Sequence, residues 1–205
     1  MRIQIDIRSA ARLTFVALAL FLPGCDPVAE VPVWGTVPEF SLINQSSEPY
    51  GTAQLQARPW IADFIFTKCP DRCPMLTREM VELQTELHER GWDDVMFVSI
   101  SVDPVNDTPE VLTAYAAKHG AKLDSWQFLT GTRDGIWSLS TDGFKLPVKE
   151  IKDDYAGPIL HSNRFVLADG RQQIRGYYDA FDGDDRAKLL RDLEIVRAEP
   201  ASAAP

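Results

Sequence analysis

Cysteine, clustered positive charge and long hydrophobic runs are scarce or missing in this sequence. It has only three cysteines in 205 residues, too few for a domain held together by a framework of disulfides. Its net charge is -9 and no run of Lys or Arg occurs, so nucleic acid is excluded as a partner, because phosphate binding needs clustered cations. The apolar run Leu13 to Leu22 has ten residues, whereas a bilayer-spanning helix needs about 20. With 45% hydrophobic residues, the composition is that of one globular domain with short tails.

The amino-terminal residues have the pattern of an export signal. Positive charge at Arg2, Arg8 and Arg12 accompanies the apolar run, as in cleaved signal peptides. The next residues, Leu22-Pro23-Gly24-Cys25, resemble the lipobox of bacterial lipoproteins, in which the cysteine becomes the lipidated first residue. We therefore expect a lipoprotein-type signal peptide over residues 1–24 and a lipid on Cys25. This anchor would hold the protein outside the cytoplasm, on the periplasmic face of the bacterial inner membrane. The alternative is an ordinary signal peptide in which Cys25 is incidental.

Composition divides the remaining chain into three parts. Residues 25–36 carry Pro27, Pro32 and Gly35 among small residues, which is typical of a tether. We expect one folded domain over residues 37–198, and a disordered Ala- and Pro-rich tail over residues 199–205.

Hydrophobic periodicity in the domain predicts strands that alternate with helices. Strands are expected over residues 60–66, 95–102, 127–129, 164–168 and 173–178, and helices over residues 74–91, 108–119, 134–140 and 185–197. Asp169-Gly170 lies between the last two strands and predicts a tight antiparallel hairpin turn. The fold class is therefore α/β, with a central mixed sheet flanked by helices. Residues 44–51 look irregular, and the pattern assigns no role to Asp63 within the first apolar run.

Cys69 and Cys73 lie between the first predicted strand and its helix. The amino terminus of a helix offers unpaired N–H groups and a positive dipole end, so we expect lowered pKa values for both thiols. Pro74 is expected at the first helical position, with the two cysteines in a bent loop before it. Thioredoxin-like exchange proteins generally separate their cysteines by two residues, whereas three residues separate this pair. The wider loop could close a disulfide, but it also lets both sulfurs face one soft cation, for which copper(I) is the obvious candidate.

His161 is the best candidate for a third ligand. It follows Gly157 and Pro158 in a segment that enters the predicted hairpin, where a side chain can lean over the edge of the sheet. A neutral imidazole would complete a trigonal copper(I) site. Spacing alone favours the alternative, a structural role in which His161 caps a turn or hydrogen-bonds the sheet.

Four stretches of the chain resemble a known family. They are Asp63 to Pro74, Val98 to Pro104 with Asp107-Thr108-Pro109, Leu129 to Thr132, and Asp153-Asp154-Tyr155 leading to His161-Ser162 and Asp169-Gly170. In this order they resemble the Sco/SenC family of copper chaperones, over roughly residues 37–193. The resemblance implies a thioredoxin-like fold and a copper site formed by Cys69, Cys73 and His161. Asp103 and Asp107 fall where the family keeps acidic residues, and are expected to support the metal ligands or to face a partner.

Two hypotheses of function follow. In the first, the protein is a metallochaperone rather than an enzyme: it takes copper from a donor protein and serves the copper-site subunit of cytochrome c oxidase or a related copper enzyme, by delivering copper or by preparing its cysteines. In the second, Cys69 and Cys73 form a redox-active disulfide in a thiol-disulfide oxidoreductase or a redox sensor. His161 discriminates between them, because thiol exchange needs no third ligand.

Overall fold

A mixed sheet forms the centre of the molecule. The computed structural model describes residues 30–70, 72–151 and 159–199 of the chain. In this part, eight strands pair in the order β1-β10-β9-β4-β5-β6-β2-β3, and β7 pairs with β8 separately. The strands are β1 (Gly35–Thr36), β2 (Ser41–Asn44), β3 (Pro49–Gly51), β4 (Trp60–Ile65), β5 (Met96–Ser101), β6 (Trp126–Thr130), β7 (Lys149–Glu150), β8 (Ile159–Leu160), β9 (Arg164–Ala168) and β10 (Gln173–Asp179). The predicted α/β class and mixed sheet are confirmed.

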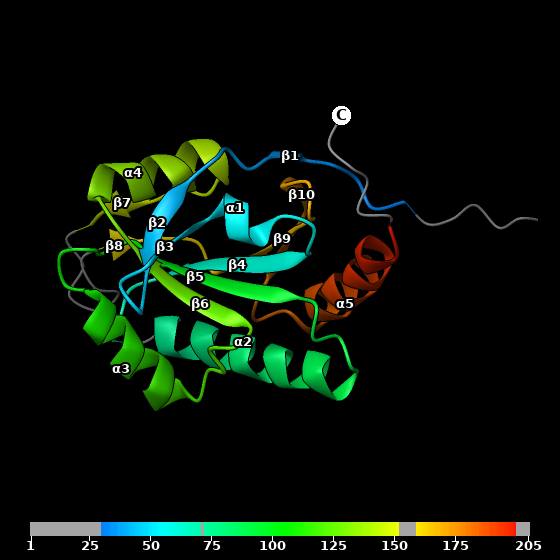
Figure 1. Ribbon diagram of the computed structural model, residues 1–205, viewed down its shortest axis with the longest axis horizontal. Coiled ribbons are helices and arrows are strands. Elements are labelled where there is room, and N and C mark those ends of the chain that lie inside the picture. Colours follow the sequence, from blue (N-terminus) through cyan, green and yellow to red (C-terminus); the bar gives the residue numbers. More distant parts are fainter. Residues whose placement is uncertain (1–29, 71, 152–158, 200–205) are drawn as a thin grey trace, which may run out of the picture.

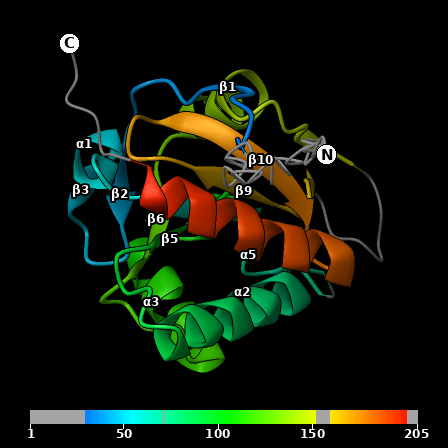
Figure 2. The same cartoon turned by 90° about the vertical axis from the view of Figure 1, so that its right-hand side faces the viewer.

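Helices cover both faces of this sheet. They are α1 (Thr52–Leu55), α2 (Arg72–Glu89), α3 (Pro109–His119), α4 (Arg133–Ser138), the π-helical turn η1 (Leu139–Gly143) and α5 (Gly183–Ala198). In Figure 1, α2 and α3 lie below the sheet and α4 lies above it. Figure 2 shows α5 alongside α2, and Arg186 of α5 reaches Glu86 of α2 at 2.9 Å.

The central strands explain the continuous apolar runs of the sequence. Every residue of β4 and β5 is buried, and the two strands pair in parallel from Trp60 opposite Met96 to Ile65 opposite Ser101. Strands covered on both faces need apolar side chains in both directions, which removes the alternation of polar and apolar residues. β9 runs antiparallel to β4 on its other side. The β4-α2-β5 connection therefore places the segment after β4 at the carboxyl end of a rigid, buried strand.

Helix α2 begins two residues earlier than predicted. It starts at Arg72, so Cys73 lies in its first turn and Pro74 is its third residue rather than its first. Proline is accepted there because the first four N–H groups of a helix have no partner within it. The other end is as predicted: Gly91 has a φ of 71°, and the Trp92 N–H donates to the Leu87 carbonyl at 2.8 Å. This is the left-handed glycine termination common in helices.

The hairpin β9-β10 is present, but its turn differs from the predicted one. Four residues connect the strands, and the left-handed residue is Gln172, with a φ of 63°. The Asp169 carboxylate accepts the N–H groups of Arg171 and Gln173, each at 2.9 Å. Gly170 is required for another reason, since a Cβ there would lie 2.7 Å from backbone atoms of Ala57.

Several boundaries at the amino-terminal side need correction. The domain does not begin at Val37: β1 pairs with β10, and Val31 is buried. The expected tether therefore belongs to the folded domain from Val31 onward, while residues 25–29 lie outside the described part. Residues 44–51 are not irregular as a whole, because β2 and β3 form an antiparallel pair there.

At the carboxyl-terminal side the expected tail begins one residue too early. The Glu199 carboxylate binds the Arg175 guanidinium through two contacts of 2.5 Å. Residues 200–205, like the expected signal peptide over residues 1–24 and Cys25, lie outside the described residues. Within the described residues, no helix has the length and apolar character needed to cross a membrane.

Candidate metal centre

Three separate elements bring the candidate ligands together. Cys69 lies in the connection after β4, Cys73 in the first turn of α2, and His161 directly after β8. The Sγ of Cys73 and the Nε2 of His161 are 3.0 Å apart, across 88 residues of sequence. The structure thus places Cys73 and His161 in direct contact.

The imidazole of His161 is held in one orientation. Its Nδ1 lies 2.9 Å from the backbone carbonyl of Ser162. A carbonyl oxygen can only accept, so Nδ1 carries the proton, and in the neutral ring Nε2 then has a free lone pair. The ring of Phe66 packs edge-on against it, with centroids 5.6 Å apart. The nitrogen that faces Cys73 is therefore the one able to bind a metal.

Cys69 lies close to Cys73. The backbone N–H of Cys73 donates to the Sγ of Cys69 at 3.3 Å, and the two cysteines are present as thiols. No set of three or more His, Cys, Asp or Glu side chains within residues 30–70, 72–151 and 159–199 has the arrangement of a preformed metal site. Cys73 contacts His161 at 3.0 Å, and Cys69 lies beside Cys73 on the same stretch of chain.

Burial dominates the electrostatics of Cys73. It raises the pKa of the thiol far above its ordinary value, and the Cys69 sulfur and the Asp63 carboxylate raise it further. The expected lowering of the pKa is therefore wrong for Cys73, because desolvation outweighs the helix terminus. Deprotonation of this thiol requires a positive charge close by, such as a bound metal ion.

Asp63 is a buried acid next to the ligands that the sequence left unassigned. It lies on β4 and is fully buried, and within the described residues both of its carboxylate oxygens lack a hydrogen-bond partner. Burial raises the pKa of Asp63 to about 7, against the opposing effects of the nearby Ser99 side chain and of His161. Its one visible signal in the sequence was a lone acidic residue in an apolar run.

Asp107 supports the loop that carries Cys69. Its carboxylate accepts the Thr67 N–H at 3.0 Å, the Thr67 hydroxyl at 2.5 Å and the Ser101 hydroxyl at 2.5 Å. The side chain is fully buried, so the expectation that it faces a partner is wrong, whereas a supporting role agrees with these contacts. Thr67 and Ser101 were not singled out by the sequence, because Thr and Ser are common in such positions.

Asp103 lies closer to the surface, in the same loop. Its backbone N–H donates to the Ser101 hydroxyl at 3.1 Å, and its carboxylate accepts from the Asn106 side chain at 2.7 Å. It lines a shallow cleft with Val105, Arg133, Glu150 and Ile159. Of the two acids, only Asp103 is placed where a partner could reach it.

A second cleft opens onto the candidate ligands. It has a volume of about 260 Å³ and is lined by Cys69, Arg72, Leu76, Ile159, Leu160, His161, Ser162 and Asn163. Cys69 and His161 therefore border solvent, while Cys73 is fully buried behind them. A soft ion entering this cleft would meet one sulfur and one imidazole nitrogen before it reaches the second sulfur.

Known proteins are similar to this chain in sequence and in fold. The family model described as SCO1/SenC matches residues 34–196 of this chain. A Stutzerimonas stutzeri protein, provisionally named as copper-binding, is 32% identical over 146 residues, which are 70% of this chain and 69% of that protein.

Two solved structures are similar over nearly the whole domain. A SCO1/SenC family lipoprotein from Bacillus anthracis is 32% identical, with a TM-score of 0.73 over 79% of this chain and 95% of that one. BsSco, described as a member of the Sco family of cytochrome c oxidase assembly proteins with a disulfide switch, is 30% identical, with a TM-score of 0.72 over 81% of this chain and 96% of that one. The chain therefore belongs to the SCO1/SenC family, and its fold is the thioredoxin-like fold of Sco proteins.

Proposed function

We propose that this protein is a copper chaperone that binds copper(I) through Cys69, Cys73 and His161. The observation that carries the proposal is the 3.0 Å contact between the Cys73 sulfur and the His161 Nε2. Thiolates select copper(I), and a neutral imidazole is a suitable further ligand. The similarity to the S. stutzeri protein, named for copper binding, supports the same assignment.

The residues around Cys69, Cys73 and His161 hold these side chains in place for copper(I). The Ser162 carbonyl holds the His161 ring so that Nε2 faces the Cys73 sulfur. Asp107 holds Thr67, two residues before Cys69. Copper(I) would replace the proton that burial otherwise keeps on Cys73, and the positive end of α2 would stabilise the resulting thiolate.

The site of action would be the outer face of the bacterial inner membrane. There the protein would receive copper from a donor protein and act on the copper-site subunit of cytochrome c oxidase or a related copper enzyme. Support comes from BsSco, which is described as a member of a family of cytochrome c oxidase assembly proteins. The B. anthracis relative is described as a lipoprotein, which supports lipidation of Cys25.

A second function uses the same two sulfurs. The contact of 3.3 Å from the Cys73 N–H to the Cys69 sulfur places the cysteines close together, and the description of BsSco names a disulfide switch. We therefore keep thiol-disulfide exchange, including reduction of the target's cysteines, as the alternative. Cys69 would be the attacking thiol, because it borders the cleft and Cys73 does not.

One titration tests the proposal against the alternative. Stoichiometry and affinity for copper(I) are measured on the reduced domain and on Cys69→Ser, Cys73→Ser and His161→Ala, with His88→Ala as the matched control, since His88 is exposed on α2 and contacts Asp93. We expect one ion in the wild type and in the control, and an affinity at least about 10-fold lower in each ligand variant. A wild type that reduces protein disulfides but binds no copper(I) would contradict the proposal.

A further inference from the structure

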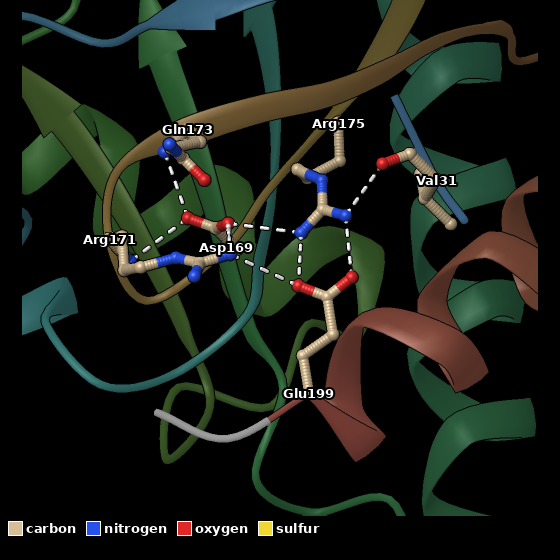
Figure 3. A network of polar contacts seen from close by, with 6 residues as sticks. All are labelled: Val31, Asp169, Arg171, Gln173, Arg175 and Glu199. Carbon is tan, nitrogen blue, oxygen red and sulfur yellow. Dashed lines mark hydrogen bonds and ion pairs between the residues drawn. The ribbon is translucent and has the colours of Figure 1, made fainter. Parts of the chain in front are cut away.

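A buried arginine fixes the amino-terminal segment to the body of the domain. Arg175 of β10 donates to the Val31 carbonyl at 2.7 Å and to the Asp169 carboxylate at 3.1 Å, and it also binds Glu199. Figure 3 shows the guanidinium between these groups, which come from the amino-terminal segment, the β9-β10 turn and the end of α5. Because Arg175 is 2% exposed, water competes little for these bonds. The segment therefore leaves the domain at a fixed place.

Two apolar side chains on this segment remain uncovered. Val33 is 52% exposed and Trp34 is 65% exposed. The Trp34 N–H donates to the Ile174 carbonyl at 2.8 Å, so the backbone is fixed to the sheet while the indole faces outward. Trp is amphipathic and is enriched at the interface between bilayer and water.

The distance along the chain limits how far this end can lie from a membrane. If Cys25 carries a lipid, six residue steps connect it to Val31, and they span at most about 20 Å when fully extended. A domain of about 160 residues has a radius of gyration of about 15 Å, so this reach is shorter than the domain is wide. The end of the domain that carries Val33 and Trp34 is thus the end next to the bilayer.

The candidate copper site and the amino-terminal segment lie at opposite ends of the central strand β4. Trp60, the first residue of β4, pairs with Ala168 beside the Arg175 cluster, whereas Cys69 follows the carboxyl end of β4. A strand of this length covers about 20 Å. In Figure 1 the amino-terminal segment enters at the right and α2 begins at the left.

We propose that Val33 and Trp34 insert into the headgroup region of the membrane and orient the domain with its copper site away from the bilayer. This inference rests on the lipid anchor in the proposed function, and it adds an interaction surface for lipid. The fixed backbone of Trp34 and the short reach from Cys25 make the bilayer the occupant of this surface. A fixed orientation would present the cleft to partners at a constant height above the membrane.

Fluorescence quenching by lipid tests the orientation. The full chain is isolated from membranes, its acyl groups are verified by mass spectrometry, and it is reconstituted into vesicles of phosphatidylcholine and phosphatidylglycerol with brominated acyl chains. We expect these lipids to quench part of the tryptophan emission in the wild type, and Trp34→Phe to remove most of that quenching. Trp137→Phe is the matched control, because Trp137 is half-buried on α4 and bonds Val102 near the copper site; it should leave the quenching unchanged.

Each other outcome overturns the inference. Lipidated protein whose quenching is the same in the wild type and in Trp34→Phe would show that Trp34 does not contact the bilayer, as would quenching lost only in Trp137→Phe. Absence of acyl groups on Cys25 would remove its premise. Neither result alters copper(I) binding by the domain, so failure here is distinguishable from failure of the copper proposal.

Discussion

Burial controls the protonation of Asp63, a carboxylate near the site. In the folded protein its pKa is raised to about 7 from an ordinary value of 3.8. Between these two pH values the folded state keeps a proton that the unfolded state has lost, so the free energy of unfolding falls as pH rises through this window. Below about pH 4 both states are protonated and the penalty vanishes.

Asp63→Asn should remove this pH dependence. We expect the variant to gain stability relative to the wild type between pH 4 and pH 8, by about 2 to 4 kcal/mol, since one pKa unit corresponds to about 1.4 kcal/mol. Urea denaturation at the two pH values measures the change. Asp134→Asn is the control, because Asp134 is exposed and stays hydrated on folding. An equal difference between Asp63→Asn and wild type at both pH values would contradict the raised pKa.

For single residues, the sequence shows which side chains can bind a metal, but it does not show how far each is buried or how its pKa is shifted. Cys69, Cys73 and His161 could be selected because their side chains bind soft metals whatever surrounds them. The raised pKa of Cys73 could not be predicted, since it depends on burial and on Asp63, which a strand brings close from ten residues away. Likewise, the Ser162 contact that fixes the His161 ring uses a backbone carbonyl, which has no sequence signature.

At the scale of elements, the connection after β4 is held by a contact between Thr67 and Asp107, which are far apart in the sequence. Asp107 lies between β5 and α3, 40 residues after Thr67, and accepts both its N–H and its hydroxyl. Asp107→Asn should destabilise the domain by about 1 to 3 kcal/mol, because an amide NH₂ group would face donors that then lack an acceptor. It should also weaken copper(I) binding, since the loop before Cys69 loses its support.

Two measurements check this role of Asp107. Urea denaturation gives the loss of stability, and a copper(I) competition titration gives the loss of affinity. Asn106→Ala is the matched change in the same loop, because Asn106 is only half-buried and its partners are the exposed Lys68 and Asp103 of its own loop. If both variants lose stability and affinity equally, the inward position of Asp107 is not what supports the loop.

The turn of the β9-β10 hairpin depends on close packing against the segment before β4. A Cβ on Gly170 would lie 2.7 Å from the Cα of Ala57 and 2.8 Å from the backbone N of Arg58. Backbone atoms cannot move aside as a side chain can, so Gly170→Ala should cost about 1 to 3 kcal/mol. Gly183→Ala is the control: nothing lies within 4 Å of its added Cβ, and alanine favours the start of α5 by up to about 1 kcal/mol. Thermal or urea denaturation of both variants tests the difference.

For the whole molecule, predictability follows the length of the elements. Long periodic segments such as α3, with Thr108 as its cap and Gly120 at its end, were predicted from local pattern alone. The short strands β1, β2, β3, β7 and β8 and the short helix α1 were missed, because segments of two to four residues are too short to show a periodicity. β1 exists because Arg175 and β10 hold it, an interaction across the whole chain. The missing elements are therefore those whose formation depends on tertiary contacts.

The proposed copper site also couples binding to the folding of the whole domain. A ligand that binds only the folded state stabilises it by about 4 kcal/mol when its free concentration is about 1,000 times Kd. Cys69 and Cys73 are near neighbours in any conformation, so they can hold copper(I) in the unfolded chain as well. His161 lies 88 residues beyond Cys73 and joins them only after folding.

The gain in stability on copper(I) loading should therefore come mainly from His161. We expect copper(I), held at a fixed free concentration by a buffering chelator, to raise the urea midpoint of the wild type clearly, and that of His161→Ala much less. His88→Ala should behave as the wild type. If His161→Ala gains as much as the wild type, the imidazole contributes nothing specific to the folded state, and the two sulfurs alone would account for copper binding.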